Sequence, residues 1–125
     1  MKQISKIVKL TALSNVSSVY GNSYVLVNSD KILKFTSPQE VDFTQTAQTE
    51  ETGLSYEQEF KAVTPDKMDS VMEFNNRKAL IILELTDGTE RVLGDTDNPC
   101  RITVTPNAGR YVIESKRTTL IPIDF

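Results

Sequence analysis

The feature that most constrains this chain is a pair of alternating segments within residues 41–63. In both segments apolar residues recur at every second position, which is the periodicity of a β-strand with one buried face. If residues 50–53 form the connecting loop, Phe43 lies opposite Phe60, whereas a slip of one residue would set apolar against polar side chains. The sequence therefore predicts a long antiparallel hairpin in this register. The other pairs that it predicts are Val41 with Ala62, Asp42 with Lys61, Gln45 with Gln58 and Ala47 with Tyr56.

The dipeptide Asp87-Gly88 stands between an apolar segment, residues 79–85, and a second short segment, residues 90–93. Asp-Gly favours a two-residue hairpin loop of type I′, in which both residues have positive φ. We therefore predict such a turn. The pairs that follow from it are Glu84 with Arg91, Leu83 with Val92 and Ile82 with Leu93.

The remaining segments predict further strands, loops and one helix. Thr64, Pro65 and Asp66 are typical of a helix start, since threonine caps free amides, proline fits the first helical position and aspartate favours the positive end of the helix. The helix is predicted at residues 65–74, with Met68, Val71 and Met72 facing the core. Before it, the sequence predicts a strand at residues 4–13, with helix as the alternative, a loop at 14–22, and a hairpin of 24–27 with 32–35 that pairs Val27 with Ile32 and Tyr24 with Phe35.

After the helix, a hairpin of residues 101–105 with 110–114 is predicted, with the pairs Arg101 with Glu114, Val104 with Tyr111 and Ile102 with Ile113. Residues 120–125 are predicted to form an edge strand, because Pro122 cannot donate to a neighbouring strand.

These elements amount to about nine or ten short strands and one short helix in a single domain, residues 1–125. Because most connections are hairpins, the expected fold class is mainly β, an antiparallel β-sandwich or a partly open barrel. A chain of 125 residues is long enough to bury a core without metals or disulfides. Cys100, the single cysteine, is expected to be a small buried apolar group.

Composition excludes several classes of function. A net charge of −3 argues against general nucleic-acid binding, which needs clustered lysine and arginine. The absence of histidine removes the usual general base, zinc ligand and central member of nucleophilic triads. No apolar run approaches the ~20 residues that span a bilayer, and no signal-peptide core is visible. We therefore expect a cytoplasmic protein that is not an enzyme, with no cofactor, no metal, no nucleic-acid partner and no membrane partner.

Asp95 and Asp97 superficially resemble oxygen ligands for calcium, but aspartate also hydrogen-bonds the backbone of tight turns. Turn chemistry is the better explanation, because the remaining ligands of a calcium loop are missing. Tyrosines such as Tyr24, Tyr56 and Tyr111 could form a stacking platform, yet they fall on strand positions that favour core packing.

The end of the 41–63 hairpin is rich in threonine, glutamine and glutamate and has few large apolar residues. Long polar hairpins on small β domains offer unpaired backbone groups to a neighbouring subunit. A hairpin that projects as an arm and one that lies flat in its own sheet are both compatible with the sequence. The residues expected to contact a partner are Thr44, Gln45, Thr46, Gln48, Thr49, Glu50, Glu51, Thr52, Glu57 and Gln58.

The chain resembles the small β-rich neck and tail proteins of tailed phages and prophages. The resemblance lies in its layout: one compact β domain, the Thr/Gln/Glu-rich hairpin at 41–63, one short helix at 65–74, no catalytic constellation, and a turn-centred stretch at 85–94. It involves no specific motif, so no functional residue is carried over. What the resemblance implies is assembly into rings or tubes, without catalysis.

The expected function is a non-enzymatic structural or assembly subunit that self-associates through the hairpin. The resemblance suggests a tail or neck component of a phage or prophage. Its partners would be further copies of the chain or other assembly proteins, and its location would be the cytoplasm, or the virion if a phage encodes it. The alternative is a small-ligand or carbohydrate-binding β-sandwich domain, which requires a concave pocket lined by aromatic and polar groups.

Overall fold

The computed structural model describes residues 3–51 and 53–123, and in this part of the chain it has ten strands and two 3₁₀ helices. The strands are β1 (Ile4–Ala12), β2 (Val16–Tyr20), β3 (Ser23–Leu26), β4 (Leu33–Thr36), β5 (Asp42–Glu50), β6 (Gly53–Val63), β7 (Arg77–Leu85), β8 (Glu90–Leu93), β9 (Cys100–Asn107) and β10 (Arg110–Thr119), and the helices are η1 (Leu13–Asn15) and η2 (Asp69–Phe74).

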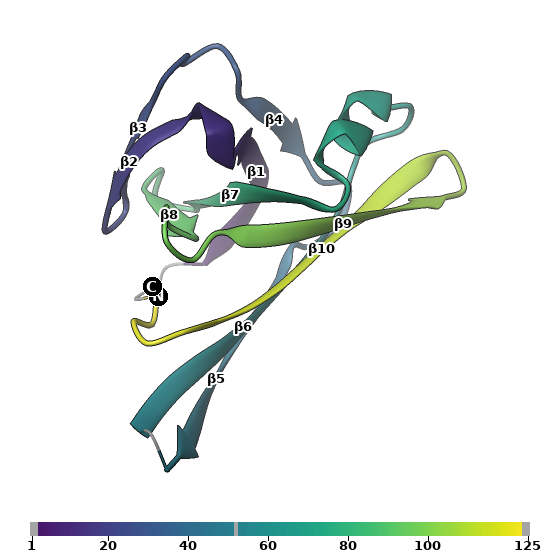
Figure 1. The fold of residues 1–125 in the computed structure, drawn as a ribbon. Helices are drawn as coiled ribbons and strands as arrows, with labels where there is room; N and C mark the ends of the chain where they lie inside the picture. The colour runs from purple at the N-terminus through teal and green to yellow at the C-terminus, as the bar shows by residue number, and fades with distance from the viewer. Residues whose placement is uncertain (1–2, 52, 124–125) are drawn as a thin grey trace.

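Eight strands form one antiparallel sheet in the order β4-β1-β7-β9-β10-β6-β5, with β8 paired to β7 outside this path. The sheet curls on itself into a half-barrel, while β2 and β3 form a separate hairpin (Figure 1). The expected mainly β fold is confirmed, as the partly open barrel.

Strand β7 is buried on both faces. Leu80, Ile81, Ile82 and Leu83 are all 0% exposed. Ile81 and Leu83 point into the main core, together with residues from most other strands and η2. Leu80 and Ile82 point to the opposite face, where β2 and β3 cover them. A strand that is apolar on consecutive positions therefore has a cover on each side, as burial of both faces requires.

The β2–β3 hairpin is fastened to the sheet by packing and by one polar cluster. Val19 and Tyr24 pack on the second face of β7. The Tyr24 hydroxyl donates to Glu90 Oε1 at 3.3 Å, and Lys9 Nζ donates to Glu90 Oε2 at 2.6 Å. This arrangement joins β3, β1 and β8 at one point.

The predicted register of the long hairpin is confirmed. In β5 and β6, Phe43 faces Phe60, Gln45 faces Gln58 and Ala47 faces Tyr56, and the pairing continues from Asp42 with Lys61 to Glu50 with Gly53. Burial of the alternating apolar face selected this register, as the sequence indicates.

The predicted turn at Asp87-Gly88 is wrong in type. Gly88 has a φ of 87°, but Asp87 is not among the residues with positive φ. Gly88 N–H donates to Leu85 O at 2.9 Å and Leu85 N–H to Thr89 O at 2.8 Å, which makes a three-residue loop with a glycine bulge. The carboxylate of Asp87 accepts hydrogen bonds from Thr89 N–H and Oγ–H at 3.0 and 2.6 Å, which favours this loop. The register is therefore shifted by one residue from the predicted one: Glu84 faces Glu90, Leu83 faces Arg91, Ile82 faces Val92 and Ile81 faces Leu93.

The predicted register of the last hairpin is wrong by two residues. Strands β9 and β10 continue to Asn107 and Arg110, which face each other. The loop is the pair Ala108-Gly109, with φ of 51° and 85°, so the two-residue turn with positive φ occurs here. A shift of two keeps every side chain on its predicted face, because the strand period is two. Glu114 consequently faces Thr103, Ile113 faces Val104 and Ser115 faces Ile102, not the partners expected.

The small hairpin predicted from residues 24–27 and 32–35 does not form. β3 pairs with β2, which lies in the segment predicted as a loop, and β4 pairs with β1. Asn15 explains this arrangement. Its buried side chain bonds Asn28 N–H and O, each at 2.9 Å, and so anchors the chain between β3 and β4 to the end of β1.

The predicted helix at 65–74 is shorter than expected. Thr64 does not cap it, since Thr64 N–H donates to Tyr111 O at 2.9 Å and its hydroxyl accepts from Tyr111 N–H at 3.0 Å. Lys67 has a φ of 61°, which is incompatible with a helix, so only η2 remains. Val71 is buried and Met68 packs on the core, but Met72 is 38% exposed, contrary to expectation.

The edge strand predicted at 120–125 is not formed by the described residues 120–123; Asp124 and Phe125 lie outside the described part of the chain. Pro122 cannot donate a ladder hydrogen bond, and the backbone of Ile123 is held instead by the side chain of Gln45.

Replacing Gly88 by valine should lower the free energy of unfolding by about 1 kcal/mol or more, because a β-branched residue at positive φ is strained. Chemical denaturation measures the effect. Thr86→Val in the same loop is the matched control, since Thr86 lacks positive φ. Equal midpoints for the two variants would show that the loop conformation is wrong.

Candidate functional site

The candidate site is the arm, which we define as strands β5 and β6 with the C-terminal half of β10. Strand β6 pairs with β10 from Val63 with Val112 to Tyr56 with Thr119, so the hairpin lies in the sheet over most of its length. The same strands run beyond the body of the half-barrel (Figure 1). The arm is therefore a three-stranded extension of the sheet, and the two alternatives of projecting or lying in the sheet are combined.

Two glutamines form the inner base of the arm. Gln58, which is 2% exposed, donates from Nε2 to Gln45 Oε1 at 2.7 Å. Gln45 Oε1 also accepts from Ile123 N–H at 2.9 Å, and Gln45 Nε2 donates to Ile123 O at 3.2 Å. The Gln45 amide thus binds a backbone segment as a neighbouring strand would, and it ties the chain after β10 to β5.

A small polar cluster lies deeper on the same inner face. Gln58 Oε1, Ser115 Oγ and Arg117 Nε are buried and have no hydrogen-bond partner among the described atoms. With Cys100 they surround an interior space that is too small to admit a water molecule. Burial raises the pKa of the Cys100 thiol to about 11, and the positive charge of Arg117 offsets part of this effect. The expected small buried cysteine is confirmed, with 1% exposure.

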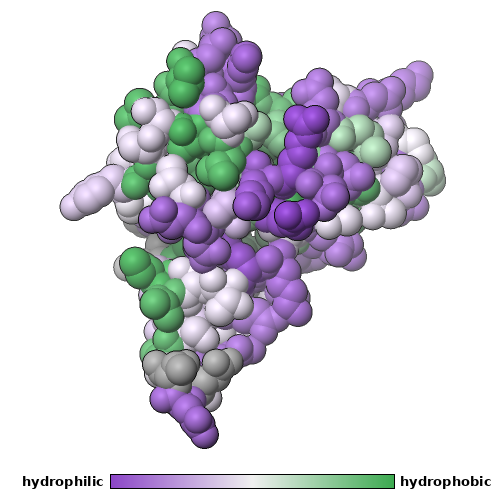
Figure 2. Space-filling model, in the orientation of Figure 1, coloured by the Kyte–Doolittle hydropathy of each residue, from purple (hydrophilic) through white to green (hydrophobic). Residues whose placement is uncertain are grey.

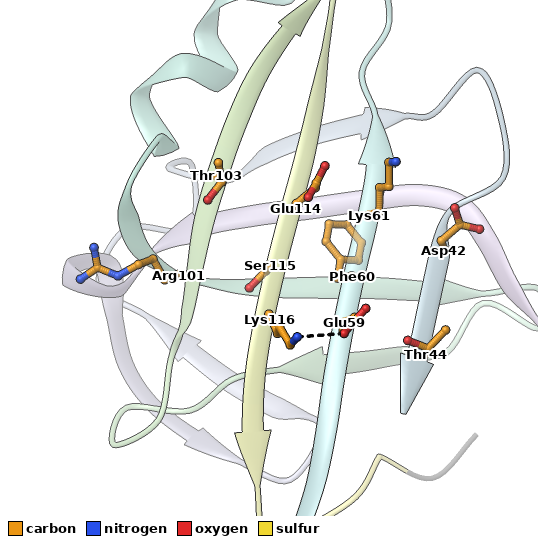
Figure 3. A pocket seen from close by; sticks show the side chains of 10 residues that line it. All are labelled: Asp42, Thr44, Glu59, Phe60, Lys61, Arg101, Thr103, Glu114, Ser115 and Lys116. Atoms are coloured by element: carbon orange, nitrogen blue, oxygen red, sulfur yellow. Dashed lines mark ion pairs between the residues drawn. The ribbon is translucent and has the colours of Figure 1, made fainter. Parts of the chain in front are cut away.

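The outer face of the arm is polar and exposed. Lys116 Nζ contacts Glu57 Oε1 at 2.7 Å. It also contacts Glu59 Oε1 at 3.2 Å, the ion pair drawn in Figure 3. The hydrogen bond to Glu57 raises the pKa of Lys116, and the same contact lowers the pKa of Glu57. These ion pairs hold β6 to β10.

The same face carries a shallow hollow of about 580 Å³ whose lining alternates acidic and basic side chains. Figure 3 shows Asp42, Lys61 and Glu114 across β5, β6 and β10, with Arg101 on β9. The one aromatic residue of the lining, Phe60, is 4% exposed. The hollow therefore presents no aromatic ring on which a sugar could stack.

The outer edge of β5 has unpaired backbone groups. Thr64 N–H points to β10, so the alternation of an antiparallel ladder turns the amides of Glu57 and Glu59 toward β5. By the same alternation, the amides of Ala47 and Thr49 point away from β6. Within the described chain β5 is the last strand of the sheet, and no strand lies beyond it. Ala47 and Thr49 thus offer two donors on an edge.

The structure separates the residues expected to contact a partner into two groups. Gln58 and Gln45 face inward and hold the arm, so they are positioning residues. Thr52 lies outside the described residues, and only the backbone of Glu50 is described, as the last residue of β5. The other six lie on the accessible part of the arm: Thr44, Thr46, Thr49 and Glu51 are exposed, and Gln48 and Glu57 are half-buried.

Three exposed apolar residues were missed by sequence reasoning. Leu54, Leu120 and Ile121 are 50%, 78% and 78% exposed. They lie at the same end of the arm, because Tyr56 faces Thr119, and apolar side chains line one margin of the arm in Figure 2. The consecutive apolar residues Leu120 and Ile121 could have indicated this surface, but the sequence analysis placed them in an edge strand.

Other titratable groups have structural contacts. The hydrogen bond to Glu90 raises the pKa of Lys9, burial raises the pKa of Tyr24, and the hydrogen bond to Asp69 raises the pKa of Tyr111. Asp95, a possible calcium ligand, accepts from Asp97 N–H at 2.9 Å and Asn98 N–H at 2.6 Å, which is turn chemistry.

Comparisons with protein-family models, with curated proteins and with solved structures give no match to this chain. Among the described residues, no helix has the length and apolar character required to span a membrane. The described residues also contain no group of three or more aspartate, glutamate, cysteine or histidine side chains that could hold a metal ion.

Replacing Gln45 by alanine should lower the free energy of unfolding by about 1–3 kcal/mol, because it leaves the buried Gln58 Nε2 without its acceptor. It should also speed hydrogen exchange at the Ile123 amide. Gln48→Ala is the matched control on β5, because Gln48 bonds Glu57 on the outer face, and its effect should stay within about 0.5 kcal/mol. Equal effects of the two substitutions would contradict the role of Gln45.

The Cys100 thiol should not react with thiol reagents in the native protein at pH 8, because it is buried and protonated. A thiol with a raised pKa destabilises the fold only above its unfolded value, so stability should fall as pH rises from about 9 toward 11. Cys100→Ala should remain folded and remove part of that fall, up to about 2 kcal/mol. Rapid native labelling, or identical pH profiles of the two proteins, would contradict this account.

Proposed function

We propose that the protein is a non-enzymatic assembly subunit whose arm adds a strand to a neighbouring protein. The observation that carries the proposal is the outer edge of β5, where the amides of Ala47 and Thr49 have no strand beside them in the described chain. An unpaired edge of this length is a template for β-strand addition. The neighbour is a second copy of the chain or another assembly protein, and a neck or tail structure of a phage is the setting that the layout favours.

The construction of the arm supports this proposal. Gln45 and Gln58 fix the base, and the ion pairs of Lys116 with Glu57 and Glu59 hold β6 to β10. The strand to be offered is thus ordered before it meets a partner, which lowers the entropic cost of association. Leu54, Leu120 and Ile121 add apolar surface at the end of the arm.

The groups with displaced pKa values also fit a non-enzymatic role. The pKa of Cys100, Lys9, Tyr24, Tyr111 and Lys116 is raised and that of Glu57 is lowered, so each moves away from neutral pH. General acids and bases need a pKa near the working pH. The hollow on the outer face gives no support to a ligand-binding domain, because it lacks accessible aromatic groups.

Proline at Ala47 tests the proposal. Proline removes the outward amide and is tolerated on an edge strand, so Ala47→Pro should change the free energy of unfolding by less than about 1 kcal/mol. It should lower the mass of the assembly, measured by light scattering over a range of protein concentrations.

Thr46→Pro is the matched control. The amide of Thr46 points to Glu57 in the β5–β6 ladder, so its loss should destabilise the hairpin itself. If the protein is monomeric at all concentrations and with candidate partners, the proposed function is wrong. Unchanged assembly of Ala47→Pro would exclude the β5 edge as the contact.

A further inference from the structure

The two ends of the sheet have opposite charge. Residues 38–60, which include β5 and most of β6, contain six acidic and no basic residues. Residues 3–37, which include β1 and β4, contain four lysines and a single aspartate. Strands β5 and β4 are the two ends of the main path through the sheet. One end of the sheet is therefore built from an acidic segment and the other end from a lysine-rich segment.

Strand β4 carries an unbalanced positive charge. Lys34 faces Lys9 across the β1–β4 ladder, and like charges in this position are destabilising. Lys9 is neutralised by Glu90, whereas the exposed Lys34 has no ion pair with any described residue. Lys31, just before β4, is also exposed. A carboxylate placed beside β4 would relieve this repulsion.

The arm has carboxylates available for such a contact. Lys116 already pairs with Glu57 and Glu59. Glu51 is exposed in the loop at the end of the arm, next to Glu50 in the sequence. The exposed Glu51 thus places negative charge beside the end of β5, where an added strand would run.

We propose that β5 of one copy pairs with β4 of a second copy, with Glu50 and Glu51 beside Lys31 and Lys34. This inference rests on the proposed function and names the partner surface. The contact joins two different edges, so it is heterologous and repeats from copy to copy, giving a closed ring or an open filament. It continues one antiparallel sheet through successive subunits.

Pairing of β5 with β5 of a second copy is the competing arrangement. An antiparallel pair of this kind would bring the acidic end of one arm toward Asp42 at the base of the other. Like charges would then meet at both ends of the contact. Charge complementarity favours β4 as the partner of β5.

Two charge-reversed proteins test the inference. One carries Glu50→Lys and Glu51→Lys, and the other carries Lys31→Glu and Lys34→Glu. At low ionic strength, each alone should associate at least about tenfold more weakly than the parent. An equal mixture should associate as strongly as the parent in sedimentation velocity, because each reversed arm then meets a reversed β4 and the two variants alternate.

The protein with Lys31→Glu and Lys34→Glu should remain folded, because the glutamate at position 34 then faces Lys9. Its thermal midpoint verifies this, and Lys31→Gln with Lys34→Gln is the milder substitute, with a smaller loss of association. Arg77→Glu with Lys78→Glu is the matched control, because both residues are exposed at the start of β7. This control should associate as the parent does.

The outcomes separate the two proposals. A parent that never associates overturns the proposed function and this inference with it. Two results would overturn only the pairing of β5 with β4 in a parent that associates. One is an unchanged mass of the Lys31→Glu, Lys34→Glu protein, and the other is a mixture of the two reversed proteins that does not associate. Recovery in the mixture, whether as rings or as filaments, supports the inference.

Discussion

The structure depends on the burial of β7 on both of its faces. Each large apolar side chain removed from water contributes about 1.5–3 kcal/mol, and β7 supplies Leu80, Ile81, Ile82 and Leu83 in succession. No single layer satisfies such a strand. The curled sheet covers one face and the β2–β3 hairpin covers the other, so the half-barrel and its added hairpin follow from one apolar segment.

The core holds the arm in position, but the exposed residues of the arm do not pack against the core. Phe60 and Ala62 anchor β6 in the main core, and Gln58 and Gln45 then replace apolar packing with a chain of amide hydrogen bonds. Beyond these glutamines the arm is mainly polar, apart from Leu54, Leu120 and Ile121 at its end. A gradual change from packed to hydrogen-bonded to exposed residues gives an ordered strand with a free edge.

Local turn chemistry explains where sequence reasoning failed. Asp87 accepts hydrogen bonds from Thr89, which favours a three-residue loop, whereas Ala108-Gly109 adopts the two-residue turn. Positive φ at a non-glycine residue costs about 1–2 kcal/mol, which is comparable to one or two hydrogen bonds, so neighbouring contacts decide such turns. The arm was better predicted, because its two faces differ so strongly that only one register buries Phe43 and Phe60 together. The tie between Gln45 and Ile123 joins residues far apart in the sequence and has no local signal.

The sequence by itself determined the mainly β class, the register of the arm and the polar character of its end, because alternation of apolar residues is a local property of each strand. Tertiary structure decided that β3 pairs with β2 and β4 with β1, since the buried Asn15 side chain holds the connecting chain in place. It also decided that β4 and β5 become the two ends of one sheet. Strand order depends on contacts between distant segments, and the periodicity of each strand is the same whichever neighbour it takes.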